Sequence, residues 1–160
     1  MHRDDPRIRR VRDLIDAGAQ LATSDLPGAI GAFLDARAEL VTLGLMEAAA
    51  AVLMDAVSAA RRNQDRALAM RLCRRASRDD PHWGDPLSTL ALVETEQANA
   101  LVQANEITKA RILYGRAARH HGRAAQLLQS TNPEAAAIER KFEAFVKARR
   151  KAVAGWPRRP

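Results

Sequence analysis

The segment DRALAMRLCRRA, residues 65–76, decides the fold because its pattern occurs three times in the chain. The other copies are DLPGAIGAFLDA, residues 25–36, and EITKARILYGRA, residues 106–117. In each copy an acid is followed by an alanine, a larger residue and a second alanine, at offsets of 40 and then 41 residues. The aligned positions are Asp25, Asp65 and Glu106; Ala29, Ala69 and Ala110; Phe33, Cys73 and Tyr114; and Ala36, Ala76 and Ala117. A period of this length holds two helices and indicates stacked helical hairpins.

Helical signals cover nearly the whole chain. Apolar residues recur at the spacing of one helix face, and the strand-like alternation of apolar and polar residues is absent. The pairs Asp5-Pro6 and Asn132-Pro133 mark helix starts, and Gly44 marks a helix end. The predicted helices cover about 6–23, 26–41, 45–62, 65–79, 86–104, 107–129 and 133–153. We therefore expect an all-α fold of about three stacked antiparallel helical hairpins, an α-solenoid, with a C-terminal capping helix.

A second set of positions strengthens the repeat. Twelve residues before the first alanine of each copy stand Ala17, Val57 and Ala98, on the preceding predicted helix. Together with the pattern on the second helix, they resemble the tetratricopeptide repeat over residues 8–129. Three departures are a period longer than the usual length of about 34 residues, Cys73 in place of an aromatic residue, and a closing proline in the second copy alone. The alternative is an alanine-rich helical bundle without a repeat.

Length and composition predict one globular domain. The chain has 160 residues, of which 28% are charged. We expect residues 1–153 to form a single domain and residues 154–160 to form a basic tail that contains Trp156 and Pro157. No apolar run has the length of a membrane span, and the N-terminus lacks the apolar stretch of a signal peptide. With Cys73 as the sole cysteine, no internal disulfide can form, and we expect a cytoplasmic location.

Basic side chains gather in three places. The net charge of +7 comes from residues 140–160, because residues 1–139 hold equal numbers of basic and acidic residues. Two rows of arginines share helix faces on the second helices of the second and third hairpins. These candidate contacts for phosphates or an acidic protein are Arg71, Arg74, Arg75, Arg78, Arg116, Arg119, Arg123, Lys147, Arg149, Arg150 and Lys151, with Trp156 in the tail. The alternative is a solvated surface, since aromatic side chains for base stacking do not accompany the rows.

No constellation of residues predicts catalysis, a cofactor or a metal ion. On a helix His120 and His121 point about 100° apart, so they cannot easily share a metal, and we expect them to be solvated. The spacing of Arg116 and His121 fits the short Arg–His motif of the HEPN ribonucleases, but among so many arginines this spacing arises by chance. Cys73 occupies an apolar repeat position and is expected to be a buried, inert thiol. We predict a protein that is not an enzyme.

The resemblance to the tetratricopeptide repeat implies a function in protein binding. Members of that family bind proteins through a surface formed by the first helix of each hairpin. The positions that would line it here are Ser58, Arg61, Arg62, Thr95, Asn99 and Gln103. The leading hypothesis is therefore a non-catalytic adaptor or scaffold with protein partners, as one subunit of a larger complex. The alternative is a small basic subunit of a ribonucleoprotein or DNA-bound complex, with a HEPN-like ribonuclease as a distant third. The oligomeric state stays open.

Overall fold

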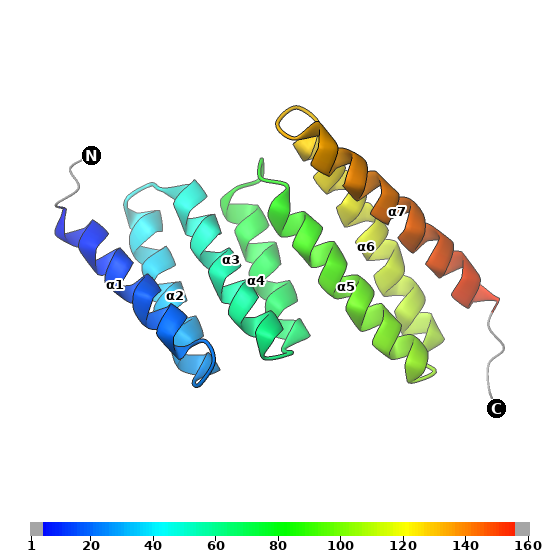
Figure 1. Ribbon diagram of the computed structural model, residues 1–160, viewed down its shortest axis with the longest axis horizontal. Helices are drawn as coiled ribbons and strands as arrows, with labels where there is room; N and C mark the ends of the chain where they lie inside the picture. The colour runs from blue at the N-terminus through cyan, green and yellow to red at the C-terminus, as the bar shows by residue number, and fades with distance from the viewer. Residues whose placement is uncertain (1–4, 156–160) are drawn as a thin grey trace. The chain divides into compact units, whose positions relative to one another are not determined.

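The computed structural model describes residues 5–155 and confirms the all-α prediction for them. Strands are absent from this range, and the helices that pair within each half of the chain run in opposite directions (Figure 1). The described helices are α1 (Pro6–Leu21), α2 (Leu26–Thr42), α3 (Met46–Arg62), α4 (Arg66–Asp79), α5 (Asp85–Gln103), α6 (Ile107–Leu128) and α7 (Pro133–Ala154). Each helix ends within one or two residues of its predicted bounds. Trp156 and the rest of the predicted tail after Gly155 lie outside the described residues.

The helix starts follow from local capping chemistry. The carboxylates of Asp5, Asp25 and Asp65 accept hydrogen bonds from backbone N–H groups in the first turns of α1, α2 and α4. Asn132 does the same for α7 through the N–H of Ala135. These side chains satisfy amide groups that would otherwise lack a partner at the helix ends. α5 begins at Asp85, and Gly84 holds its cap position without a side-chain hydrogen bond.

The repeat positions are equivalent in the structure as well as in the sequence. The aligned alanines of the three copies are fully buried, and the larger residues between them are buried as well. These positions are Ala29, Phe33 and Ala36 on α2; Ala69, Cys73 and Ala76 on α4; and Ala110, Tyr114 and Ala117 on α6. Small side chains let two helices approach closely, and the larger side chain fills the remaining space. Cys73 is the buried thiol that the sequence predicts.

The chain divides into two compact units, Met1–Pro81 and His82–Pro160. In the first, α1 pairs with α2 and α3 pairs with α4, and the two hairpins stack through α2 and α3. In the second, α5 pairs with α6, and α7 packs on α6 as the predicted final helix. The structure thus has the predicted helical hairpins. The single domain over residues 1–153 stays a prediction. No described helix combines the length and apolar content that a membrane span requires.

Candidate functional site

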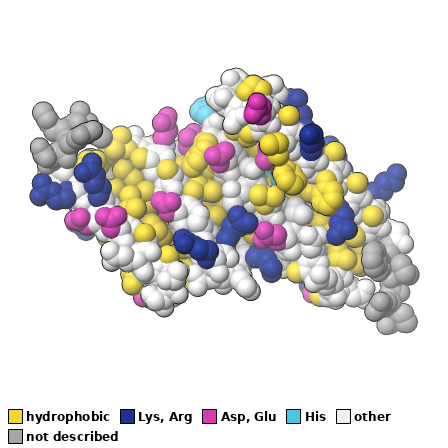
Figure 2. Space-filling model, in the orientation of Figure 1, with side chains coloured by type: hydrophobic (Ala, Val, Ile, Leu, Met, Phe, Trp, Pro, Cys, Tyr) yellow, Lys and Arg dark blue, Asp and Glu magenta, His cyan; other side chains and the backbone are white. Residues whose placement is uncertain are grey.

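Three large apolar side chains are exposed along one side of α7. Ile138, Phe142 and Phe145 have exposed fractions of 52%, 40% and 55%. Their spacing of four and then three residues places them on one side of the helix. We call them the α7 strip. In Figure 2, hydrophobic side chains gather along α7 on the face that the figure shows. Large side chains of this kind normally enter the core, so a continuous exposed row requires an explanation.

Contacts from α5 and α6 hold the α7 strip in place. The ring of Phe142 stacks on His121 of α6, with centroids 5.4 Å apart and an interplanar angle of 17°. One turn before Phe142, Glu139 Oε2 lies 2.6 Å from His121 Nδ1. Ser88 of α5 donates a hydrogen bond of 2.6 Å to Glu139 Oε1. Glu139, next to the strip, therefore contacts both α5 and α6, and Phe142 in the middle of the strip contacts α6.

Of the two adjacent histidines, His121 is buried, contrary to the sequence-based expectation, and His120 is only partly exposed. His121 is fully buried against Glu139, and its Nε2 atom has no hydrogen-bond partner. His120 Nδ1 lies 2.8 Å from Glu94, which is also buried. Burial raises the pKa of Glu139, but hydrogen bonds from His121 and Ser88 outweigh it, so this pKa lies below its ordinary value. The sequence could not show these pairs because the carboxylates come from other helices.

The predicted first-helix contacts fall into two sets, one in each unit. On α3 these are Ser58, Arg61 and Arg62, and on α5 they are Thr95, Asn99 and Gln103. Ser58 and Arg62 are exposed, and both bond to backbone carbonyls of their own helix. Asn99 accepts a hydrogen bond of 2.5 Å from Tyr114, so its oxygen is engaged in holding α5 to α6. The role of both sets in partner binding stays a prediction.

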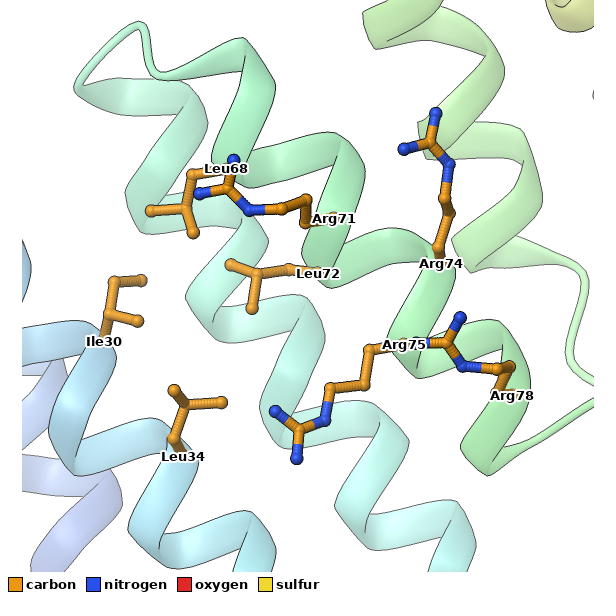
Figure 3. Close-up of a pocket in the computed structure, with 8 residues that line it drawn as sticks. All are labelled: Ile30, Leu34, Leu68, Arg71, Leu72, Arg74, Arg75 and Arg78. Carbon is orange, nitrogen blue, oxygen red and sulfur yellow. The ribbon is translucent and has the colours of Figure 1, made fainter.

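The first arginine row lines a groove between α2 and α4. The cavity measures about 400 Å³. Its lining residues are Ile30 and Leu34 from α2 and Leu68, Arg71, Leu72, Arg74, Arg75 and Arg78 from α4. We call it the arginine groove. In Figure 3 the side chains of Arg71 and Arg75 extend toward Ile30 and Leu34, whereas Arg74 extends away from them.

The sequence signalled the arginines of this groove but not its apolar floor. Leu68 and Leu72 are four residues apart on α4, and Ile30 and Leu34 have the same spacing on α2. Each pair is an ordinary core signal when one helix is considered alone. The groove exists because α2 and α4 both pack on α3 and leave these side chains facing one cavity.

The second arginine row and the basic end of α7 are exposed. Arg116, Arg119 and Arg123 all face solvent on α6. Arg149, Arg150 and Lys151 are exposed on α7, whereas Lys147 bonds to Glu143. Their role in binding phosphates or an acidic protein stays a prediction. Trp156 was the aromatic member of this set and lies outside the described residues.

The geometry does not assemble a catalytic site from the candidate residues. Arg116 is exposed while His121 is buried, so this pair does not present both side chains to one substrate. Ser88 donates to the Glu139 carboxylate and not to His121, so these three side chains do not have the Ser–His–acid order of a catalytic triad. Among residues 5–155 no group of three or more His, Cys, Asp or Glu side chains could hold a metal ion.

The fold and its exposed surfaces define the class: an all-α protein of paired helices. The sequence matches no protein-family model and no curated protein. Among solved structures it is similar to the crystal structure of MamA protein, with 17% sequence identity over 95% of this chain and 99% of that chain. The TM-score of 0.26 is too low for this likeness to say anything about function. The resemblance to the tetratricopeptide repeat stays a prediction from the sequence.

Proposed function

We propose that the protein is a non-catalytic adaptor or scaffold that binds another protein through the α7 strip. The observation that supports this function best is the exposure of Ile138, Phe142 and Phe145 in one row. Contiguous exposed apolar side chains are typical of protein interaction sites. Aromatic side chains such as Phe142 and Phe145 are also enriched at the centres of interfaces, where they bury much area at little entropic cost.

The surroundings of the strip favour a specific site over a loosely packed helix. Phe142 is fixed by its stack on His121, and the buried hydrogen bonds of Glu139 fix α7 against α5 and α6. A surface that is already ordered loses less conformational entropy when a partner binds.

A peptide selection on the whole chain tests the proposal. Random peptides of about 16 residues, long enough for four helical turns, are displayed and selected, and their affinities are then measured. We expect selected peptides to lose at least about tenfold in affinity for the double variant Ile138→Ser, Phe145→Ser. Ile112→Ser is the matched control, because Ile112 is 51% exposed on α6 and lies outside the strip. Equal affinity for the wild type and the double variant would contradict the proposal.

Nucleic-acid binding is a second candidate, supported by the exposed row of Arg116, Arg119 and Arg123. Fluorescence titration with single- and double-stranded nucleic acid at about 50 and 200 mM salt measures it directly. Phosphate contacts would give an affinity that falls steeply with salt. Loss of that binding in Arg116→Glu, Arg119→Glu, with the α7 strip unchanged, would favour this candidate over the adaptor.

A further inference from the structure

The arginine groove combines an apolar floor with a cationic rim. Its floor consists of Ile30, Leu34, Leu68 and Leu72, and its charged lining residues are all arginines. Arg71, Arg75 and Arg78 are exposed, and no ion pair joins them to an acid within residues 5–155. We propose that this groove binds an acidic amphipathic helix of a partner protein. This is a second contact surface, in the other unit from the α7 strip, and goes beyond the function proposed above.

The chemistry of the groove identifies the class of partner. An amphipathic helix places leucine-like side chains on one side and carboxylates beside them, which matches a floor of aliphatic groups with arginines along its rim. Arginine binds carboxylates through two parallel hydrogen bonds, so the rim adds orientation as well as attraction. The cavity of about 400 Å³ is large enough for a few apolar side chains of such a helix.

A nucleic acid fits the groove less well. Phosphates would pair with Arg71 and Arg75, but the four aliphatic floor residues would then meet a charged, hydrated backbone. None of the lining residues is aromatic, so the groove offers no surface on which bases could stack.

The groove is preformed by packing beneath it. The two helices that line it both pack on α3. Arg37 of α2 also donates two hydrogen bonds to Asp79 of α4, at 2.6 and 2.7 Å. Ile30 and Leu72 are nearly buried, with exposed fractions of 9% and 5%, so neighbouring side chains hold these two floor residues in place. Side chains that are already packed lose less conformational entropy when a partner binds.

A second copy of this chain is a less suitable occupant than a separate protein. The most acidic described helix is α5, which contains Asp85, Glu94 and Glu96 and no Lys or Arg. Glu94 is buried beside His120, so it cannot contribute to an acidic outer face. The remaining acids, Asp85 and Glu96, lie three turns apart and do not form a stripe along a helix.

The test uses the whole chain and a labelled synthetic peptide of about 16 residues with Leu and Glu at amphipathic helix spacing. We expect saturable binding that weakens at least about tenfold in the double variant Arg71→Glu, Arg75→Glu. The matched control is Arg9→Glu, Arg12→Glu, which makes the same charge change on the exposed side of α1. We expect it to change the affinity less than about twofold, since distant exposed charges act weakly.

Four results would overturn the proposal. One is an equal loss of affinity in both double variants, which would indicate non-specific attraction of charge. Another is undiminished binding of a peptide with Ser in place of every Leu, because the apolar floor would then be unused. The third is no saturation below about 100 μM peptide. The last is displacement of the peptide by double-stranded nucleic acid at equal or higher affinity. Because Ile138→Ser, Phe145→Ser leaves the groove intact, each proposal can fail without the other.

Discussion

At the residue scale, Gly18 of α1 lies close against the ring of Phe33 of α2. A methyl group at position 18 would stand 2.9 Å from Cε1 and Cζ of the Phe33 ring, and Phe33 is only 2% exposed. Gly18→Ala gains about 1 kcal/mol in helix propensity but loses about 2 kcal/mol through overpacking. We therefore expect a net loss of about 1 kcal/mol in the free energy of unfolding, measured by urea denaturation.

Gly31→Ala is the control for this prediction. Gly31 lies within α2, and a methyl group there would meet no atom within 4 Å. The substitution should stabilise the protein by about 0.5–1 kcal/mol, because only the helix propensity changes. If both variants were stabilised, Phe33 would not be packed on Gly18 as described.

The hydrogen bonds of Glu139 predict a dependence of stability on pH. The pKa of Glu139 is lower in the folded protein than its ordinary value of about 4.3. Its ionised form therefore stabilises the fold above about pH 5, and this contribution is lost as the pH falls through the lowered pKa. Glu139→Gln should remove the dependence. We expect the wild-type Tm to fall more steeply between about pH 5 and 3 than that of the variant.

The exposed carboxylate of Asp35 on α2 provides the comparison. Asp35→Asn should leave the slope of Tm against pH unchanged, since no hydrogen bond of Asp35 is described. Equal slopes for the wild type and Glu139→Gln would mean that Glu139 is not held in ionised form by His121 and Ser88.

At the element scale, the ion pair between Arg37 and Asp79 joins α2 to α4, the two helices that line the arginine groove. Both side chains are mostly buried, with exposed fractions of 14% and 7%. The hydrogen bond with Asp79 raises the pKa of Arg37, burial lowers it less, and the charge of Asp79 adds to the rise. Removing Asp79 leaves Arg37 as a buried cation without its partner, which lowers the free energy of unfolding by about 3 kcal/mol or more. The substitution also removes the unfavourable interaction of a carboxylate with the negative C-terminal end of the α4 dipole, which stabilises the fold by up to about 1 kcal/mol.

Asp79→Ala should therefore lower the free energy of unfolding by about 2–3 kcal/mol. Glu39→Ala is the control, because its pair with Arg10 is 3.4 Å long and Arg10 is 69% exposed. That substitution should cost less than about 1 kcal/mol. Urea denaturation of the two variants side by side checks both values, and equal losses would refute the assignment of the buried pair.

The helices and their pairing could be predicted from the sequence because their signals are local or periodic. Capping groups such as Asp25 and Asp65 act within their own first turn, and the alanines of the repeat recur at a fixed offset. The α7 strip and the arginine groove depend on which sides of the helices stay uncovered. A row such as Ile138, Phe142 and Phe145 has the same spacing whether it is buried or exposed. For this reason the arginines could be identified from the sequence, whereas neither apolar surface could.

At the scale of the whole molecule, each of the two compact units has a core of its own. Phe33, Leu53 and Val57 are buried in the first, whereas Tyr114 and Val146 are buried in the second. If each core suffices, residues 1–81 and 82–160 should fold as separate chains. Domains of this size are close to the lower limit for a core without disulfides or metals, so each fragment should be less stable than most domains.

We expect the far-UV circular dichroism of an equimolar mixture of fragments 1–81 and 82–160 to match that of the whole chain. Each fragment should also melt in one cooperative transition. A fragment that is unfolded alone would instead support the single domain over residues 1–153 that the sequence predicts, because its helices would then need the other half for stability. Folding of the 82–160 fragment is the more stringent of the two tests. Its three helices, α5, α6 and α7, must by themselves keep water away from the buried hydrogen bond between His121 and Glu139.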